Sequence, residues 1–258
     1  MIREHHHLVP NILHFLAGGL MGLVSASLAQ QFGWRSADRL PGESRWPHCV
    51  FCQAAMTWQD VFPLFGWLLR PDTLSLSCPC TRRKNLWTQP LTEGIGFLLG
   101  VIAMYLAGWN PLVVPLCLGL GLLPGLAMVD LHFGLMPDGL SLLIGVFGLI
   151  WIALGGGDIY LALMVSASLL GLGLFCALVY SRWRKKEMLG LGDVKFFAAA
   201  GLWLQPEIAP WFLVLAGVLG AAMGLSWQRL GGGKESPFAP ALCLALALCV
   251  LYQVTQLP

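Results

Sequence analysis

Eight apolar segments run through this chain of 258 residues, and most of them approach the length that crosses a lipid bilayer. They extend over residues 8–30, 91–108, 111–129, 139–156, 159–181, 191–204, 208–228 and 238–256. A helix needs about 20 apolar residues to span the hydrocarbon core. Charged residues make up only 11% of the chain, against about 25% in soluble domains. The sequence therefore predicts an all-α polytopic membrane protein with about eight transmembrane helices.

The basic residues indicate how these segments are oriented. Every Lys and Arg except Arg3 falls on the side of the membrane that holds the loop 31–90. Because loops rich in Lys and Arg stay on the cytoplasmic side, we expect this side to face the cytoplasm of a bacterial-type inner membrane. Both chain ends are then on the opposite side. The net charge of +2 gives no reason to expect nucleic acid as a partner, and the lipid bilayer is the partner that the composition demands.

This pattern divides the chain into an N-terminal transmembrane helix over 1–30, a cytoplasmic domain over 31–90 and a transmembrane domain over 91–258. The cytoplasmic domain is too small to form a large core, so we expect a bound metal or a disulfide to stabilise it.

Four cysteines in close pairs are the candidates for this stabilising link. Cys49 and Cys52 form a C-x-x-C pair, and Cys78 and Cys80 form a C-x-C pair. Four thiolates in this arrangement are typical of a structural zinc site, and a reducing cytosol disfavours disulfides. The sequence predicts zinc on these cysteines, with His48 as a substitute ligand and four free thiols as the alternative.

Three aspartates lie on the cytoplasmic side, where apolar segments end or begin: Asp130, Asp138 and Asp193. An ionisable group in a spanning segment costs about 2.5–3.5 kcal/mol, so each is a functional candidate. Asp138 follows Pro137 in the first turn of a helix, where a carboxylate favours the positive end of the helix dipole, and capping is its favoured role. Asp193 has capping or an ion pair with Lys195 as alternatives, and Asp130 has simple contact with water.

Asp130 and Asp193 together supply the groups that peptide hydrolysis needs without a metal or a nucleophile. Two neighbouring carboxylates cannot both ionise, so they share a proton. The ionised one activates a water, and the protonated one polarises the scissile carbonyl. Gly190 and Gly192 leave the backbone beside Asp193 bare, which suits close approach of a peptide. The chain has neither the G-x-S-x-G nor the H-E-x-x-H motif.

These motifs resemble the type IV prepilin peptidase family, the GxGD-type intramembrane aspartic proteases of type IV pili and type II secretion. The resemblance extends from about residue 44 to the C-terminus. The blocks that carry it are Asp130 with Pro137-Asp138, Gly190 to Phe196, the cysteine region Trp46 to Leu68, Pro90 to Glu93, and Phe238-Ala239-Pro240. The resemblance implies that Asp130 and Asp193 are catalytic, supported by Gly190, Gly192, Lys195, Pro137 and Asp138.

The same resemblance implies the substrate and a second reaction. Substrates would be prepilins or pseudopilins with a short basic leader and one apolar helix, cut after a glycine at the cytoplasmic face. Many members also methylate the new N-terminus with S-adenosylmethionine. Proteolysis itself needs no cofactor. Two alternatives are a catalytically inactive membrane assembly factor for pilus or secretion machinery, and a transporter whose carboxylates carry protons or ions.

Overall fold

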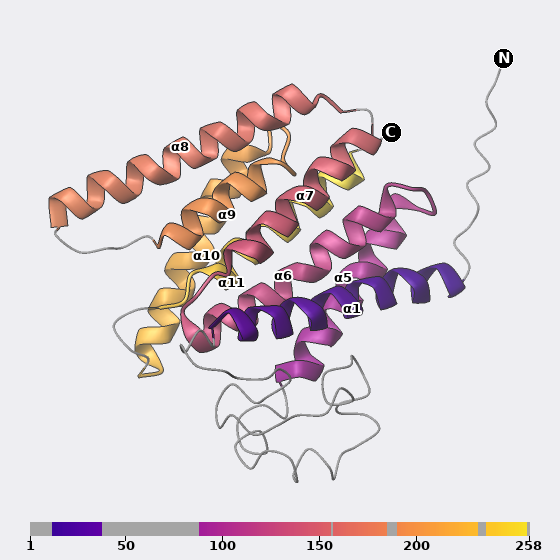
Figure 1. Ribbon diagram of the computed structural model, residues 1–258, viewed down its shortest axis with the longest axis horizontal. Coiled ribbons are helices and arrows are strands. Elements are labelled where there is room, and N and C mark those ends of the chain that lie inside the picture. The colour runs from indigo at the N-terminus through magenta and orange to yellow at the C-terminus, as the bar shows by residue number, and fades with distance from the viewer. Residues whose placement is uncertain (1–11, 38–87, 156, 185–189, 232–235, 257–258) are drawn as a thin grey trace, which may run out of the picture.

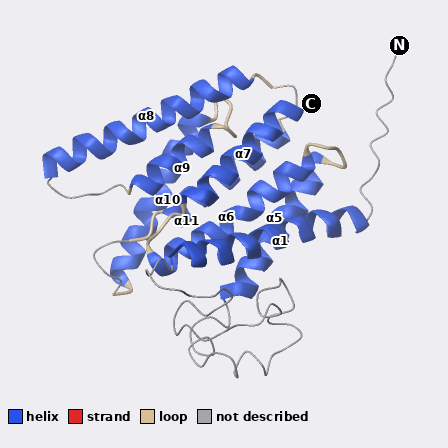
Figure 2. Cartoon of the chain, viewed as in Figure 1, coloured by secondary structure: helices blue, strands red, loops and turns tan. Residues whose placement is uncertain are grey.

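The computed structural model describes residues 12–37, 88–155, 157–184, 190–231 and 236–256, and within these ranges all regular structure is helical (Figure 2). The helices are α1 (Ile12–Ala37), α5 (Thr88–Ala107), α6 (Val113–Phe133), α7 (Asp138–Leu154), α8 (Ile159–Arg184), α9 (Leu191–Gly201), α10 (Ala209–Arg229) and α11 (Ala239–Thr255). Each overlaps one predicted apolar segment, so the prediction of an all-α polytopic fold is confirmed. Cys49, Cys52, Cys78 and Cys80 lie outside the described residues.

Helix α6 is the centre of the bundle, and most of its residues are buried. Helices α1 and α5 cover one side of it, and α7 and α11 pack on the rest (Figure 1). Helix α9 packs between α7 and α8. The two outer helices, α8 and α10, keep many large apolar side chains exposed, as expected of surfaces that face lipid. Residues on α6 are therefore placed in the interior by helices from both halves of the chain.

Glycines allow α1 and α5 to pack with their backbones in contact. A Cβ atom on Gly22 would overlap the carbonyl of Gly96, and one on Gly100 would overlap the carbonyl of Gly18. Small residues drive this kind of association in bilayers, where apolar side chains gain nothing by leaving lipid. The glycine-rich composition of these two segments thus fixes how closely the helices approach.

Among the described residues, five helices are long and apolar enough to cross a membrane: α1 (over Ile12–Trp34), α5, α6, α8 (over Ile159–Val179) and α10. Helices α7 and α11 are apolar and slightly shorter, with 17 residues each. Helix α9 has only 11 residues, about 16 Å of helix, so it ends before the predicted limit at residue 204. The chain turns after Gly201, and Trp203 is buried in this turn. Pro206 disfavours helical backbone at Gln205 and so prevents the helix from resuming there.

The helices alternate in direction, which gathers the sequence motifs at one end of the bundle. Helices α1, α6, α8 and α10 finish there, and α5, α7, α9 and α11 begin there (Figure 1). We call it the aspartate end, because it carries Asp130, Asp138 and Asp193. The opposite end, with Asp158 and Glu207, is the far end. Helix α1 begins and α11 finishes at the far end, as the charge pattern predicts for the two chain ends.

Candidate active site

Asp130 lies in the last turn of the central helix. Gly134 ends α6 in a left-handed conformation (φ 61°), and its N–H donates to the backbone carbonyl of Asp130 at 2.8 Å. Glycine adopts this conformation without the steric cost that other residues incur. The sharp end of α6 leaves the Asp130 side chain buried, with 6% of its surface exposed, although the chain turns towards solvent only a few residues later.

The Asp130 carboxylate is held by the N-terminus of α11. Its Oδ2 accepts a hydrogen bond of 2.9 Å from the backbone N–H of Ala239, and the backbone of Phe238 also donates to this carboxylate. Ala239 is the first residue of α11, and free N–H groups at a helix N-terminus stabilise negative charge. The segment Phe238-Ala239-Pro240 therefore acts through its backbone.

Asp193 lies in the first turn of α9, after the Gly190-Leu191-Gly192 segment, and of the two glycines only Gly192 is required by the packing. The Gly190 backbone N–H donates to the Asp193 carboxylate, which is the return half of a capping box. A Cβ atom on Gly192 would lie 2.9 Å from Cβ of Met136, in the turn between α6 and α7. Gly192 thus allows α9 to start directly against the end of α6.

The structure brings Asp130 and Asp193 into one site. Asp193 is half-buried and lies close enough to Asp130 for a negative charge on one carboxylate to disfavour a negative charge on the other. The buried thiol of Cys243, one turn into α11, lies close enough to both carboxylates to interact with them electrostatically. Three helices that are distant in sequence, α6, α9 and α11, therefore converge on the pair.

Lys195 and Asp138 form an ion pair across the start of two helices. Lys195 Nζ lies 2.6 Å from Asp138 Oδ2, and joins α9 to the first turn of α7. Both side chains are largely exposed. Lys195 is thus paired with Asp138 and not with Asp193, which leaves the second carboxylate of the site without this neutralising charge. Pro137 is buried beside Asp138 and precedes the first residue of α7.

Two contacts that support the site could not be predicted from the residue types in the sequence. The donors to Asp130 are backbone groups, and only the Phe238-Ala239-Pro240 motif points to them. The indole of Trp203 donates to the carbonyl of Ile144 at 2.9 Å and so ties the end of α9 to α7. A tryptophan inside an apolar run looks like ordinary core, and only its N–H, which needs a partner when buried, hints at this role.

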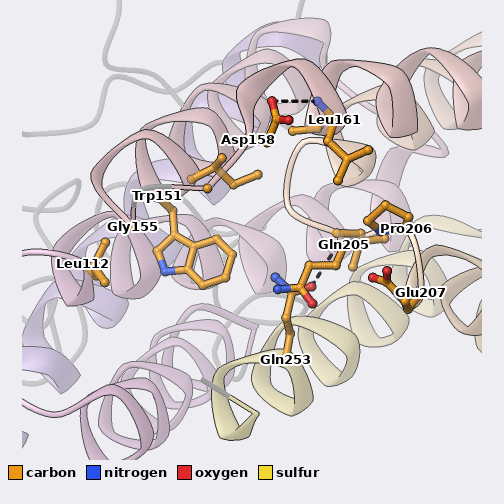
Figure 3. Close-up of a pocket in the computed structure, with 13 residues that line it drawn as sticks. Leu112, Trp151, Gly155, Asp158, Leu161, Gln205, Pro206, Glu207 and Gln253 are labelled. Carbon is orange, nitrogen blue, oxygen red and sulfur yellow. Dashed lines mark hydrogen bonds between the residues drawn. The ribbon is translucent and has the colours of Figure 1, made fainter. Parts of the chain in front are cut away.

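A separate cavity of about 400 Å³ lies at the far end and is lined by Trp151, Asp158, Gln205, Glu207 and Gln253, among others (Figure 3). Most of its polar groups are already engaged. Asp158 accepts from the N–H groups of Tyr160 and Leu161, as a residue capping α8. Gln253 accepts from the Gln205 N–H at 3.0 Å and donates to the Trp203 carbonyl at 3.2 Å. The polar groups of the cavity therefore cap α8 and join α11 to the segment after α9 by hydrogen bonds. The cavity is remote from the aspartate pair.

Comparison with known proteins links this site to one family. The model of a family described as the type IV leader peptidase family matches residues 116–225, a range that contains Asp130, Asp138, Asp193 and Lys195. No solved structure matches this chain.

Curated relatives match most of the chain. A "Prepilin leader peptidase/N-methyltransferase" of Aeromonas hydrophila is 33% identical over 214 residues, which cover 79% of this chain and 70% of that protein. A protein of the same name from Legionella pneumophila is 29% identical over 208 residues, covering 76% and 69%. A "Type 4 prepilin-like proteins leader peptide-processing enzyme" of Escherichia coli is 30% identical over 205 residues, covering 76% and 72%.

Proposed function

The chain belongs to the type IV leader peptidase family, and we propose that it removes the basic leader of type IV prepilins and pseudopilins with Asp130 and Asp193 as its catalytic pair. The single observation that carries the mechanism is the approach of two carboxylates, one buried and one half-buried, at the end of the central helix. Peptide hydrolysis by two carboxylates needs this arrangement.

The hydrogen bonds of the two aspartates support a division of roles. Two backbone N–H groups and the N-terminus of α11 stabilise negative charge on Asp130. Asp130 is then the base that takes a proton from the attacking water. Asp193 carries the shared proton, polarises the scissile carbonyl and donates to the leaving amine. Gly190, Gly192 and Pro137 position the backbone around the pair, and Lys195 and Asp138 hold α9 against α7.

A cleavage assay tests this mechanism. A purified prepilin is incubated in detergent with wild type, Asp130→Asn, Asp193→Asn or Glu207→Gln, and the product masses are measured. Wild type and Glu207→Gln, whose carboxylate is exposed at the far end, should cleave equally. The two aspartate variants should lose about 10²- to 10⁴-fold in rate, the usual contribution of a general acid or base. Substantial cleavage by both would contradict the assignment.

The protein is a multi-pass membrane protein, and we propose that it resides in the bacterial inner membrane with the aspartate end in the cytoplasm. Arg182, Lys195 and Arg229 lie at that end, in agreement with the rule that Lys and Arg stay inside. Alkaline phosphatase fused after Pro258 should then be active, because α11 ends at the far end. Activity of a cytoplasmic reporter at the same position would contradict this orientation.

We also propose that Cys49, Cys52, Cys78 and Cys80 hold a structural zinc ion, because four thiolates are a typical donor set for zinc. These residues lie outside the described ranges. Purified wild type should contain about one zinc per chain, and Cys49→Ser should contain less.

Several relatives carry the name N-methyltransferase, and we propose the same second activity here. With S-adenosylmethionine present, the cleaved pilin should gain the mass of one methyl group at its new N-terminus. A product of unchanged mass under conditions in which a relative methylates would contradict this second activity.

A further inference from the structure

Asp138 is unlike the other carboxylates at the aspartate end. Within the described residues there, Glu93 and Asp130 are buried and Asp193 is half-buried, whereas 69% of the Asp138 side chain is exposed. The exposed Lys and Arg side chains described at this end are Lys195, Arg182 and Arg229, and all are positive. In the described part of the chain, Asp138 is thus the exposed anion beside the catalytic pair.

The partner of Asp138 can be exchanged at little cost. An ion pair between exposed side chains contributes about 0–1 kcal/mol, and 53% of the Lys195 side chain is exposed. Lys195 also lies near the N-terminus of α9, where the helix dipole disfavours a cation. A second cation that reaches Asp138 can therefore replace the ammonium of Lys195 without disturbing the buried parts of the site.

The Lys195–Asp138 ion pair lies on the side of the site where the leader of a bound substrate would extend. The apolar helix of a substrate lies in the bilayer, so the residues before the scissile bond extend from the aspartates into water. Lys195 follows Asp193 by less than one helical turn, and Asp138 is within hydrogen-bond distance of Lys195. Asp138 therefore lies at the same end of the bundle as the catalytic pair and is more exposed to solvent than either member of it.

We propose that Asp138 binds a basic side chain of the substrate leader, which displaces Lys195 from the ion pair. The inference rests on the proposed function and adds a specificity-determining residue to it. Asp138 recognises positive charge before the scissile bond, and Lys195 occupies the same position while no substrate is bound. Because Arg182 and Arg229 at the same end are positive, Asp138 is the exposed charge among the described residues there that attracts a basic leader.

The test compares two prepilins that differ only in the leader, one with its Lys residues and one with Gln in their place. kcat/KM is measured for both with wild type, Asp138→Asn, Asp138→Glu, Lys195→Gln and the far-end control Glu207→Gln. Wild type, Asp138→Glu and Glu207→Gln should prefer the basic leader by about two- to fivefold for each charge, the range of an exposed ion pair. Asp138→Asn should lose this preference, mainly through KM.

Lys195→Gln separates recognition from a merely structural link between α7 and α9. If the ion pair only holds the helices together, Asp138→Asn and Lys195→Gln should each lose the same activity on the Lys leader and on the Gln leader. This outcome overturns the inference. If Asp138 recognises the leader, Lys195→Gln keeps or increases the preference, because the competing cation is gone. Added salt should weaken the wild-type preference.

Failure of the inference differs from failure of the proposed function. An unchanged leader preference in Asp138→Asn, with cleavage intact, overturns the role of Asp138 and leaves the peptidase assignment standing. Absence of cleavage by wild type overturns both.

Discussion

The Asp130 carboxylate accepts a 2.9 Å hydrogen bond from the backbone N–H of Ala239, 109 residues later in the chain. The contact joins the end of the central helix to the start of the last one. It does two things at once, because it satisfies a free N–H of α11 and stabilises the charge of a buried carboxylate. Asp130 is therefore both a candidate catalyst and part of the structure. Among the described residues, the backbone donor to Asp193 is Gly190, at the start of its own helix.

Replacement of Asp130 by Ala should destabilise the protein more than the same change at Asp193. Loss of the Asp130 side chain leaves the Ala239 N–H buried and unpaired, which costs about 1–3 kcal/mol. Asp193→Ala removes a repulsion and only a local cap, and should change stability by less. Thermal unfolding in detergent, followed by tryptophan fluorescence, measures the difference.

Asp130→Asn is the control for this comparison, because its amide oxygen still accepts from Ala239. It should retain most of the stability that Asp130→Ala loses, although both variants should lose most of the cleavage activity. Equal melting temperatures for Asp130→Ala and Asp193→Ala would show that the contact with α11 contributes nothing.

The sequence was sufficient for the helices that the structure describes, because apolar length and charge placement both act locally. The catalytic roles of Asp130 and Asp193 stay a prediction. The sequence was not sufficient for the contacts between helices. The donors to Asp130 are backbone groups with no residue preference of their own. The pairing of Lys195 with Asp138 depends on how α7 and α9 pack, and the nearer Asp193 was the alternative that sequence spacing suggested. Similarly, the turn that buries Trp203 was hidden within an apolar run that looked continuous.

Gly192→Ala should displace the start of α9 and lower activity by at least about tenfold. Its Cβ would lie 2.9 Å from Cβ of Met136, and overpacking of this kind costs about 1–3 kcal/mol. The catalytic pair is sensitive to small shifts, since a displacement of about 1 Å can cost about 10²-fold in rate. Cleavage rate and melting temperature are the measurements.

The double variant Gly192→Ala/Met136→Gly tests the cause, because it removes the Cβ and Cγ atoms of Met136 that the new methyl group meets. It should recover part of the lost activity. Gly217→Ala is the matched control, since a Cβ there meets nothing within 4 Å, and it should cleave like wild type. Equal loss in the single and double variants would place the effect of Gly192 elsewhere.

Trp203→Phe should destabilise the protein by about 0.5–1.5 kcal/mol, because the indole hydrogen bond to the carbonyl of Ile144 is lost. The ring would still stack on Trp151, whose centroid lies 5.8 Å away. Trp211→Phe, at a side chain that is 64% exposed, should have little effect. A melting temperature of Trp203→Phe equal to that of Trp211→Phe would show that the hydrogen bond is dispensable.

Gly96→Ala should weaken the packing of α1 on α5, whereas Gly94→Ala on the same helix should not. A Cβ on Gly96 would lie 2.5 Å from the Gly22 carbonyl oxygen and 2.6 Å from Cβ of Ala26, and a Cβ on Gly94 would meet nothing within 4 Å. The backbone of α1 cannot move aside as a flexible side chain can, so the two helices must separate, at a cost of about 1–3 kcal/mol.

The two substitutions add the same methyl group to α5, so composition and helix propensity are matched between them. Gly94→Ala should leave the melting temperature unchanged or raise it, because Ala favours helix over Gly by about 1 kcal/mol. Gly96→Ala should lower it. If both variants melt alike, contact between the two backbones is not what holds α1 on α5, and the apolar side chains that flank the glycines must do so instead.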